Sequence, residues 1–159
     1  MLLAIPPVAV SAVRRLGDRE TIRRLIGVGV AICAAAILGV AAYLKPSPDG
    51  LGTHTQLFMP ECGWIMLMDL PCPTCGMTTA FAHAAEGHLV ASLATQPLGG
   101  ILAIATAIAL LSGLYVAATG SQVAVLFGRL CTRRAAWILS AVAVGAWIYK
   151  ILLYRGILG

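Results

Sequence analysis

Residues 54–88 hold most of the side chains in this chain that can bind a metal ion or carry out thiol chemistry. Three of the five cysteines and all three histidines fall in this stretch: His54, Cys62, Cys72, Cys75, His83 and His88. Thiolates and neutral imidazoles are common ligands of zinc, and a thiolate is also a nucleophile. Of the other two cysteines, Cys33 lies in an apolar run, where we expect it to pack as a small hydrophobic residue, and Cys131 lies in a basic loop.

A disulfide is the simplest interpretation of the three clustered cysteines. Thiols outside the cytoplasm oxidise, and small irregular segments there are often held by covalent links. Three is an odd number, so one thiol would be left without a partner.

A metal site is the second interpretation. Cys62, Cys72 and Cys75 together with one histidine make a set of ligands that zinc accepts in tetrahedral geometry. His83 follows Cys75 by eight residues, a rise of about 12 Å along a helix. It is a candidate only if the helix bends or begins later, and His54 on the preceding loop is the easier fourth ligand.

A redox-active dithiol is the third interpretation. Pro73 is suited to the first position of a helix, which would make Cys72 the N-cap and place Thr74, Cys75 and Gly76 in the first turn. Unpaired N–H groups at that end would stabilise a thiolate, with Cys72 as nucleophile and Cys75 as resolving thiol. No βαβ pattern surrounds the motif, so parts that a catalytic site needs are missing from the sequence.

The residues after the CPTC motif predict two short helices. The first continues through "MTTAFAHAA" and ends near Gly87, a suitable C-cap. The second covers "HLVASLATQ" and leads to Pro97, again at a first helical position. The preceding "WIMLMDL" fits a strand, a short helix or a segment that dips into the membrane.

The composition of the chain is that of a membrane protein. Of its 159 residues, 60% are hydrophobic and 11% are charged, and the mean hydropathy is +0.92. Soluble domains carry about 25% charged residues. Three apolar runs are long enough to cross a bilayer, at residues 25–44, 97–119 and 135–154. We therefore predict an all-α integral membrane protein with about three transmembrane helices and short extramembrane or interfacial helices in the loop between the first two.

The distribution of charge predicts the orientation. Residues 1–24 and 120–134 are basic, whereas residues 46–96 contain acidic residues and no Lys or Arg, with Lys45 at their edge. Basic loops remain cytoplasmic. This predicts a plasma (inner) membrane protein with a cytoplasmic N-terminus, an extracytoplasmic Cys/His loop at 45–96, and Lys150 and Arg155 on the less usual side. The net charge of +5 fits this topology and contact with the lipid bilayer, not nucleic acid.

The motif and its surroundings resemble a family of small bacterial multi-pass membrane proteins of unknown function. The shared pattern is a cysteine, about nine residues, then Pro-Cys-Pro-x-Cys-Gly-x-Thr and a later Pro-Leu-Gly that opens a transmembrane helix. The matching residues include Cys62, Cys72, Pro73, Cys75, Gly76, Thr78, Gly87 and Pro97. Thr79 stands where the family commonly has Arg, His88 replaces an acid and Gln96 replaces an Asn. The resemblance implies architecture more than activity.

These observations favour a protein that is not an enzyme and whose extracytoplasmic loop carries a structural cysteine cluster, formed by a disulfide or by a bound metal such as zinc. One alternative is a membrane thiol–disulfide oxidoreductase that uses the CPTC dithiol. Another is a subunit of a membrane transport or secretion assembly. The sequence specifies neither a substrate nor a protein partner.

Overall fold

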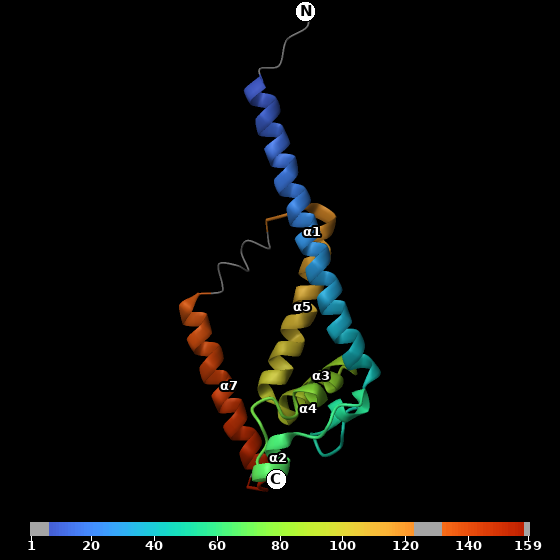
Figure 1. Ribbon diagram of the computed structural model, residues 1–159, viewed down its shortest axis with the longest axis vertical. Helices are drawn as coiled ribbons and strands as arrows, with labels where there is room; N and C mark the ends of the chain where they lie inside the picture. The colour runs from blue at the N-terminus through green and yellow to red at the C-terminus, as the bar shows by residue number, and fades with distance from the viewer. Residues whose placement is uncertain (1–6, 123–131, 158–159) are drawn as a thin grey trace, which may run out of the picture.

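The computed structural model describes residues 7–122 and 132–157, and every regular element in these ranges is helical (Figure 1). Three long helices, α1 (Pro7–Tyr43), α5 (Pro97–Thr119) and α7 (Arg133–Tyr154), run lengthwise. Between α1 and α5 the chain forms four short helices: η1 (Thr53–Leu57), α2 (Gly63–Met68), α3 (Met77–Ala85) and α4 (Leu89–Thr95). These four lie together at one end of the molecule, the same end as the C-terminus (Figure 1).

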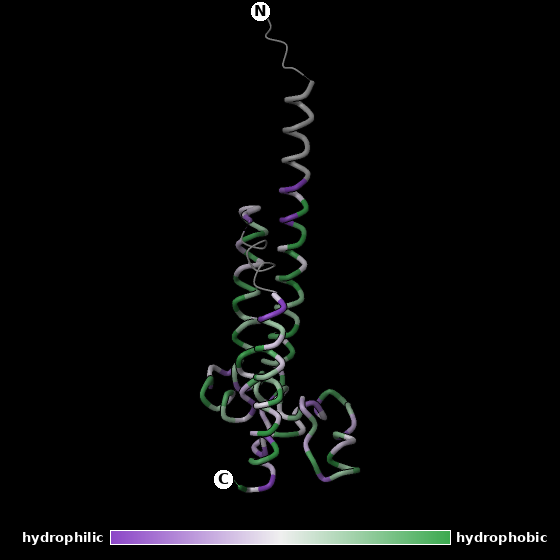
Figure 2. The backbone as a smooth tube through the Cα atoms, turned by 90° about the vertical axis from the view of Figure 1, so that its left-hand side faces the viewer, coloured by the Kyte–Doolittle hydropathy of each residue, from purple (hydrophilic) through white to green (hydrophobic). Residues whose placement is uncertain are grey.

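The three long helices are apolar and long enough to cross a membrane. The candidate spans are Arg19–Tyr43, Pro97–Thr119 and Arg133–Tyr154. Large apolar side chains along them face outward, among them Leu25, Ile32, Leu111 and Ile138. Figure 2 shows the continuous apolar character of the long helices and the more polar residues near the ends. The predicted fold class, an all-α membrane protein with short helices between the first two spans, is confirmed.

The first helix extends well beyond the apolar run at 25–44. It begins at Pro7 and is 37 residues long. Its polar part can continue the helix because charges pair at helical spacing, as Arg24 does with Glu20 at 2.7 Å. It ends at Tyr43, three residues before Pro46, which cannot continue a helix.

Small residues allow α1 and α5 to pack closely. A Cβ atom on Gly27 would lie 2.7 Å from the backbone nitrogen of Ala117, so only glycine fits at this contact. Ala31 and Ala34 of α1 and Ala103 of α5 are among the few fully buried side chains of the spans. Close contact between small residues is a common way for helices to associate in lipid, where the hydrophobic effect gives little help.

The C-terminal end of α7 is fastened to the segment between α1 and α5 by polar contacts. Trp147 Nε1 donates to the Pro71 carbonyl at 2.9 Å, and Tyr149 Oη donates to that of Ala94 at 3.0 Å. Tyr154 Oη donates to the Asp69 carboxylate at 2.7 Å. Two further bonds come from Lys150, whose Nζ donates to the carbonyls of Gly50 at 3.0 Å and Thr95 at 3.1 Å. All of these contacts hold the end of α7 against the segment between α1 and α5.

A buried hydrogen-bond network holds the short helices together. Thr79 of α3 and Thr53 of η1 are almost completely buried, and their hydroxyls lie 2.8 Å apart. Ser92 Oγ of α4 donates to the Ala80 carbonyl of α3 at 2.7 Å. The hydroxyls of Thr79 and Ser92 thus each have a partner, which is the condition under which such burial is tolerated.

Candidate functional site

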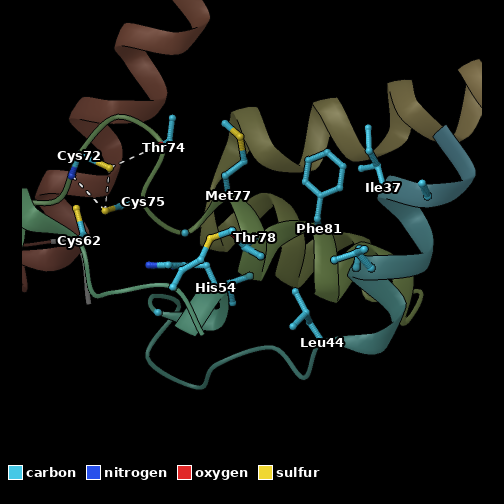
Figure 3. Close-up of a pocket in the computed structure, with 17 residues that line it drawn as sticks. Ile37, Leu44, His54, Cys62, Cys72, Thr74, Cys75, Met77, Thr78 and Phe81 are labelled. Atoms are coloured by element: carbon cyan, nitrogen blue, oxygen red, sulfur yellow. Dashed lines mark hydrogen bonds between the residues drawn. The ribbon is translucent and has the colours of Figure 1, made fainter. Parts of the chain in front are cut away.

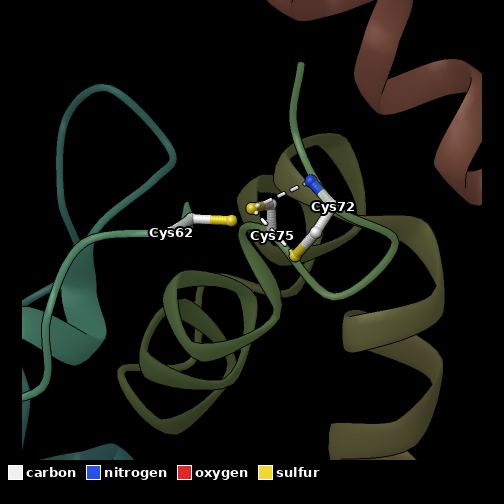
Figure 4. A group of neighbouring side chains, drawn as sticks. All are labelled: Cys62, Cys72 and Cys75. Atoms are coloured by element: carbon white, nitrogen blue, oxygen red, sulfur yellow. Dashed lines mark hydrogen bonds between the residues drawn. The ribbon is translucent and has the colours of Figure 1, made fainter. Parts of the chain in front are cut away.

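The thiols of Cys62, Cys72 and Cys75 form one cluster, with their sulfur atoms all within 4.8 Å of one another. Cys62 comes from the residue before α2, and the other two come from the turn before α3 (Figure 4). The sulfurs of Cys72 and Cys75 are 3.1 Å apart. The three thiols that the sequence singled out therefore share one location, which we call the thiol cluster.

The CPTC turn positions two of these thiols without any helix. The Cys75 N–H donates to the Cys72 carbonyl at 3.0 Å, and the Cys72 N–H donates to the Cys75 sulfur at 3.2 Å. The helix begins only at Met77, with Gly76 at φ +86° as its N-cap. The prediction that Cys72 is the N-cap and Pro73 the first helical residue was wrong. Hydrogen bonds within the turn already pair the backbone N–H groups of Cys72 and Cys75 and the Cys72 carbonyl. The helix therefore begins after the turn, at Met77.

The pKa of the Cys62 thiol is lowered from its ordinary value. Burial raises the pKa of Cys62, but hydrogen bonds to its sulfur outweigh this and lower it to about 7. The donors are the backbone N–H groups of Ile65 and Trp64 and the thiols of Cys75 and Cys72. A substantial share of Cys62 is therefore thiolate at neutral pH.

Cys75 is the buried member of the cluster, with a 7% exposed side chain. Burial raises the pKa of its thiol well above the usual range, and hydrogen bonds with the thiols of Cys72 and Cys62 act in the same direction. Cys75 therefore keeps its proton at neutral pH and is a poor nucleophile.

A largely apolar cavity of about 760 Å³ lies beside the thiol cluster. All three cysteines line one end of it, and Ile37, Leu44 and Phe81 line the other end (Figure 3). A second cavity of about 380 Å³ is more polar and includes Asp49, Glu61 and Tyr154 in its wall. Cys62 and Cys75 border both cavities, so the cluster separates an apolar space from a polar one.

The two candidate histidine ligands lie in different places. His54 borders both cavities together with Cys62, and its Nε2 is 3.2 Å from the Pro60 carbonyl oxygen. It is not among the side chains whose ligand atoms lie within 4.8 Å of the thiols in the described part of the chain. His83 belongs to a different group, at the far end of α3, with Glu86 and His88.

The remaining motif residues surround the CPTC turn or end the short helices. The carbonyl of Pro73 accepts from Gln96 Nε2 at 3.2 Å, Thr78 lines the apolar cavity, and Pro97 is the first residue of α5. Gly87 follows the end of α3 with φ +85°. Cys33 is exposed on α1, away from the cluster, and Cys131 lies outside the described residues.

Sequence reasoning missed the role of Lys150. This side chain is only 4% exposed although it belongs to a transmembrane helix. A Cβ atom on Gly76 would lie 3.0 Å from its Nζ, so the ammonium group lies directly against the turn that carries Cys75. The signal in the sequence was a lone lysine near the end of an otherwise uncharged span.

One family model matches the chain, over residues 62–111, and its description is "Protein of unknown function (DUF2752)". The matched segment begins at Cys62, includes all of the thiol cluster and ends within α5. No curated protein and no solved structure matches the chain. The chain is therefore a membrane protein with a thiol cluster, similar in this segment to a family without an assigned activity.

Proposed function

We propose that the thiol cluster binds a thiophilic metal ion, with zinc the best fit, and that the ion links the loop before α2 to the turn before α3. The observation that supports this most directly is the convergence of three sulfurs from two separate segments within 4.8 Å. A disulfide uses two sulfurs and gives the third no role. A zinc site uses all three.

The spacing of the sulfurs agrees with this proposal. Zinc binds thiolate at about 2.3 Å, so two sulfurs at a tetrahedral angle lie roughly 3.8 Å apart. The distance of 3.1 Å between Cys72 and Cys75 and the upper limit of 4.8 Å for the whole cluster bracket this value. Small side-chain rotations would bring the three sulfurs to the required distance.

The ionisation of the cluster favours metal binding at neutral pH. Cys62, with a pKa lowered to about 7, provides a thiolate that attracts the cation first. Metal binding releases protons from the remaining ligands, because only deprotonated thiols coordinate. Burial of Cys75 keeps its pKa high in the metal-free protein, so we expect proton release from this residue when the ion binds.

His54 is the nearest histidine to serve as a fourth ligand. It borders the same two cavities as Cys62 and is held only by one contact, of 3.2 Å, to the Pro60 carbonyl. Rotation of this side chain would complete a Cys₃His set. If His54 keeps its present place, the fourth position opens toward the cavities and is filled by water or a small ligand, as in sites with an exchangeable position.

A metal cross-link would stabilise a segment that has little regular structure. The chain from Leu44 to Cys62 contains only the short helix η1. Because an ordered set of three thiols is absent from an unfolded loop, the free energy of metal binding becomes free energy of folding. The proposed role is thus to fix this segment against α3 and the end of α7.

A dithiol that cycles between thiol and disulfide is the second candidate, supported by the distance of 3.1 Å between Cys72 and Cys75. It is the weaker one for two reasons. The CPTC turn precedes the helix, so Cys72 lacks the N-terminal N–H groups that activate such thiols. The thiol with the lowered pKa is Cys62, outside the CxxC pair.

The proposed setting is the outer face of a bacterial plasma membrane, with the N-terminus in the cytoplasm. Supporting this, Arg19, Arg23 and Arg24 lie at the start of the first span and the thiol cluster lies beyond its end. Lys150, a basic residue on the outer side in this topology, is buried, and its Nζ donates hydrogen bonds to two backbone carbonyls. Labelling of Cys62 in intact cells by a membrane-impermeant maleimide, but only after metal removal, would support this orientation.

Metal content and thiol state measured on the same purified sample test the proposal. We expect about one zinc per chain to remain after dialysis, lost in Cys62→Ser and in Cys75→Ser but retained in the matched control Cys33→Ser. Thiols should be protected from alkylation until a chelator is added. A Cys72–Cys75 disulfide with no bound metal, in protein prepared from the membrane without reductant, would overturn the metal site and favour the second candidate.

A further inference from the structure

We propose that His83, Glu86 and His88 form a second metal site, which binds a divalent ion such as zinc and is independent of the thiol cluster. One ligand atom from each of these three side chains lies within 4.8 Å of the others. No role in the fold accounts for this group: none of its side chains joins the buried network of Thr53, Thr79 and Ser92.

The backbone at the end of α3 holds the two histidines together. The N–H of His88 donates to the His83 carbonyl at 2.9 Å, and the N–H of Gly87 donates to the Ala84 carbonyl at 3.0 Å. With Gly87 at φ +85°, these bonds form a Schellman motif. This motif brings the residue after the glycine back over the last turn of the helix, which is where His88 meets His83.

The side chains show the same convergence. The ring centroids of His83 and His88 are 6.4 Å apart at an interplanar angle of 64°, so the rings meet edge to face. His88 Nδ1 lies 3.3 Å from the Glu86 carboxylate. The Nδ1 atom of His83 is buried and has no hydrogen-bond partner within the described ranges. This nitrogen of His83, a second imidazole and a carboxylate together offer three ligands to a cation.

The chemistry of the group selects the class of ion. Two imidazoles and one carboxylate suit zinc and related first-row ions, whereas calcium and magnesium prefer oxygen ligands. Three protein ligands leave at least one coordination position for water. The side chains of His88 and Glu86 are 67% and 42% exposed, so an ion here would exchange readily with the surrounding solution.

The helix α3 separates this group from the thiol cluster. The cysteines precede its first residue, Met77, and His83 lies in its last turn. The nine residues of α3 span about 13 Å. One ion cannot bind both groups, so blocking the thiols leaves the histidine site intact.

Zinc titration of the full-length protein in detergent, with its thiols reduced, stripped of metal and then alkylated, tests this site. We expect one zinc ion to bind, and His88→Gln, His83→Gln and Glu86→Gln each to weaken it by at least about tenfold, because loss of even an indirect ligand contact commonly costs that much. Glu61→Gln is the matched control, since it removes a carboxylate of the same segment outside the group, and it should leave the affinity unchanged.

A second readout uses the same metal-stripped protein with its thiols alkylated, so that zinc cannot bind at the thiol cluster. Zinc should protect His83 and His88, but not His54, from modification by diethyl pyrocarbonate, as read by mass spectrometry. Equal protection of all three histidines, no protection, or an equal loss of affinity in Glu61→Gln would overturn the proposal. Because the titration is done with blocked thiols, failure of the thiol site does not affect this result, and failure here leaves the thiol site standing.

Discussion

The two ends of α3 carry two clusters of side chains of metal-ligating type that differ in burial, charge and chain connection. At its start, Cys75 is 7% exposed, the thiols border two cavities, and Lys150 lies against the turn that carries Cys75. At its end, His88 and Glu86 face solution. Both ends depend on a glycine with positive φ, Gly76 at the start and Gly87 at the end.

This difference indicates what each cluster can do. A partly buried set of soft ligands held by two segments of the chain suits an ion that stays bound and stabilises the fold. An exposed set on one turn suits an ion that exchanges. The first cluster joins the residue before α2 to the turn before α3, so its loss should affect both segments. Loss of the second cluster should affect only the end of α3 and the residues just after it.

Replacement of the two glycines gives the largest expected contrast. At Gly76 an alanine Cβ would lie 2.8 Å from the Gly50 carbonyl oxygen, and the left-handed backbone is itself unfavourable. We expect Gly76→Ala to lower the free energy of unfolding by about 3 kcal/mol. At Gly87 there is no atom within 4 Å, so Gly87→Ala should cost only about 1 kcal/mol.

Denaturant titration of the purified protein in detergent measures both free energies, and zinc content of the same samples measures the effect on the thiol cluster. Gly76→Ala should lose zinc and Gly87→Ala should keep it. Equal destabilisation by the two changes would show that the start of α3 is not as tightly packed as described.

Removal of the Lys150 ammonium group is the next largest perturbation. Lys150→Met leaves the carbonyls of Gly50 and Thr95 buried without their donor, which should cost about 1.5–3 kcal/mol. The thiols should then be alkylated faster, because the Lys150 side chain no longer packs over Gly76 and the turn that carries Cys75 becomes more accessible. Arg155→Met, at an exposed position just after α7, is the matched control and should change neither stability nor alkylation rate.

A smaller effect is expected from the buried threonine pair. Thr79→Val removes the 2.8 Å contact with Thr53 and should destabilise the protein by about 1 kcal/mol. The adjacent Thr78, which lines the apolar cavity, provides the control Thr78→Val, for which we expect no loss. Thermal unfolding of the two variants compares them directly, and a greater loss in Thr78→Val would contradict the assigned network.

The mildest perturbation is a change of pH in metal-free, reduced protein. The pKa of Cys62 is lowered to about 7, so its thiolate forms as the pH rises through 7. Its alkylation rate should rise about tenfold from pH 6 to pH 8 and then level off. Cys75, whose pKa is raised by burial, should remain almost unreactive over this range. A Cys62 rate that keeps rising to pH 9 would mean that its hydrogen bonds do not stabilise the thiolate.

The fold class followed from the sequence because apolar length and loop charge are properties of the chain alone. The start of the first helix could not be predicted from the sequence. The charged residues at 19–24 are compatible both with a helix that begins at the apolar run and with one that begins earlier, at Pro7, as observed. Composition also could not reveal that Gly27 rather than Gly39 makes a close contact, because both lie in similar Ala- and Gly-rich surroundings.

For the site, the sequence predicted which thiols would gather but not how they would be held. The CxxC spacing and the isolated Cys62 pointed to one cluster, and the three sulfurs do converge. The preference of proline for the first helical position placed the helix start too early. That preference carries no information about the backbone hydrogen bonds that form within the CPTC turn. The contacts of Lys150 and Gln96 join residues far apart in sequence, and only tertiary structure brings them together.

X-ray absorption at the zinc edge, on protein purified from the membrane without reductant or added metal, tests the central claim most directly. The account predicts about one tightly bound zinc ion with three sulfur ligands at about 2.3 Å. The sulfur signal should vanish in Cys62→Ser and remain in Cys33→Ser. Zinc with only nitrogen and oxygen neighbours, or no retained zinc together with a Cys72–Cys75 disulfide, would contradict it.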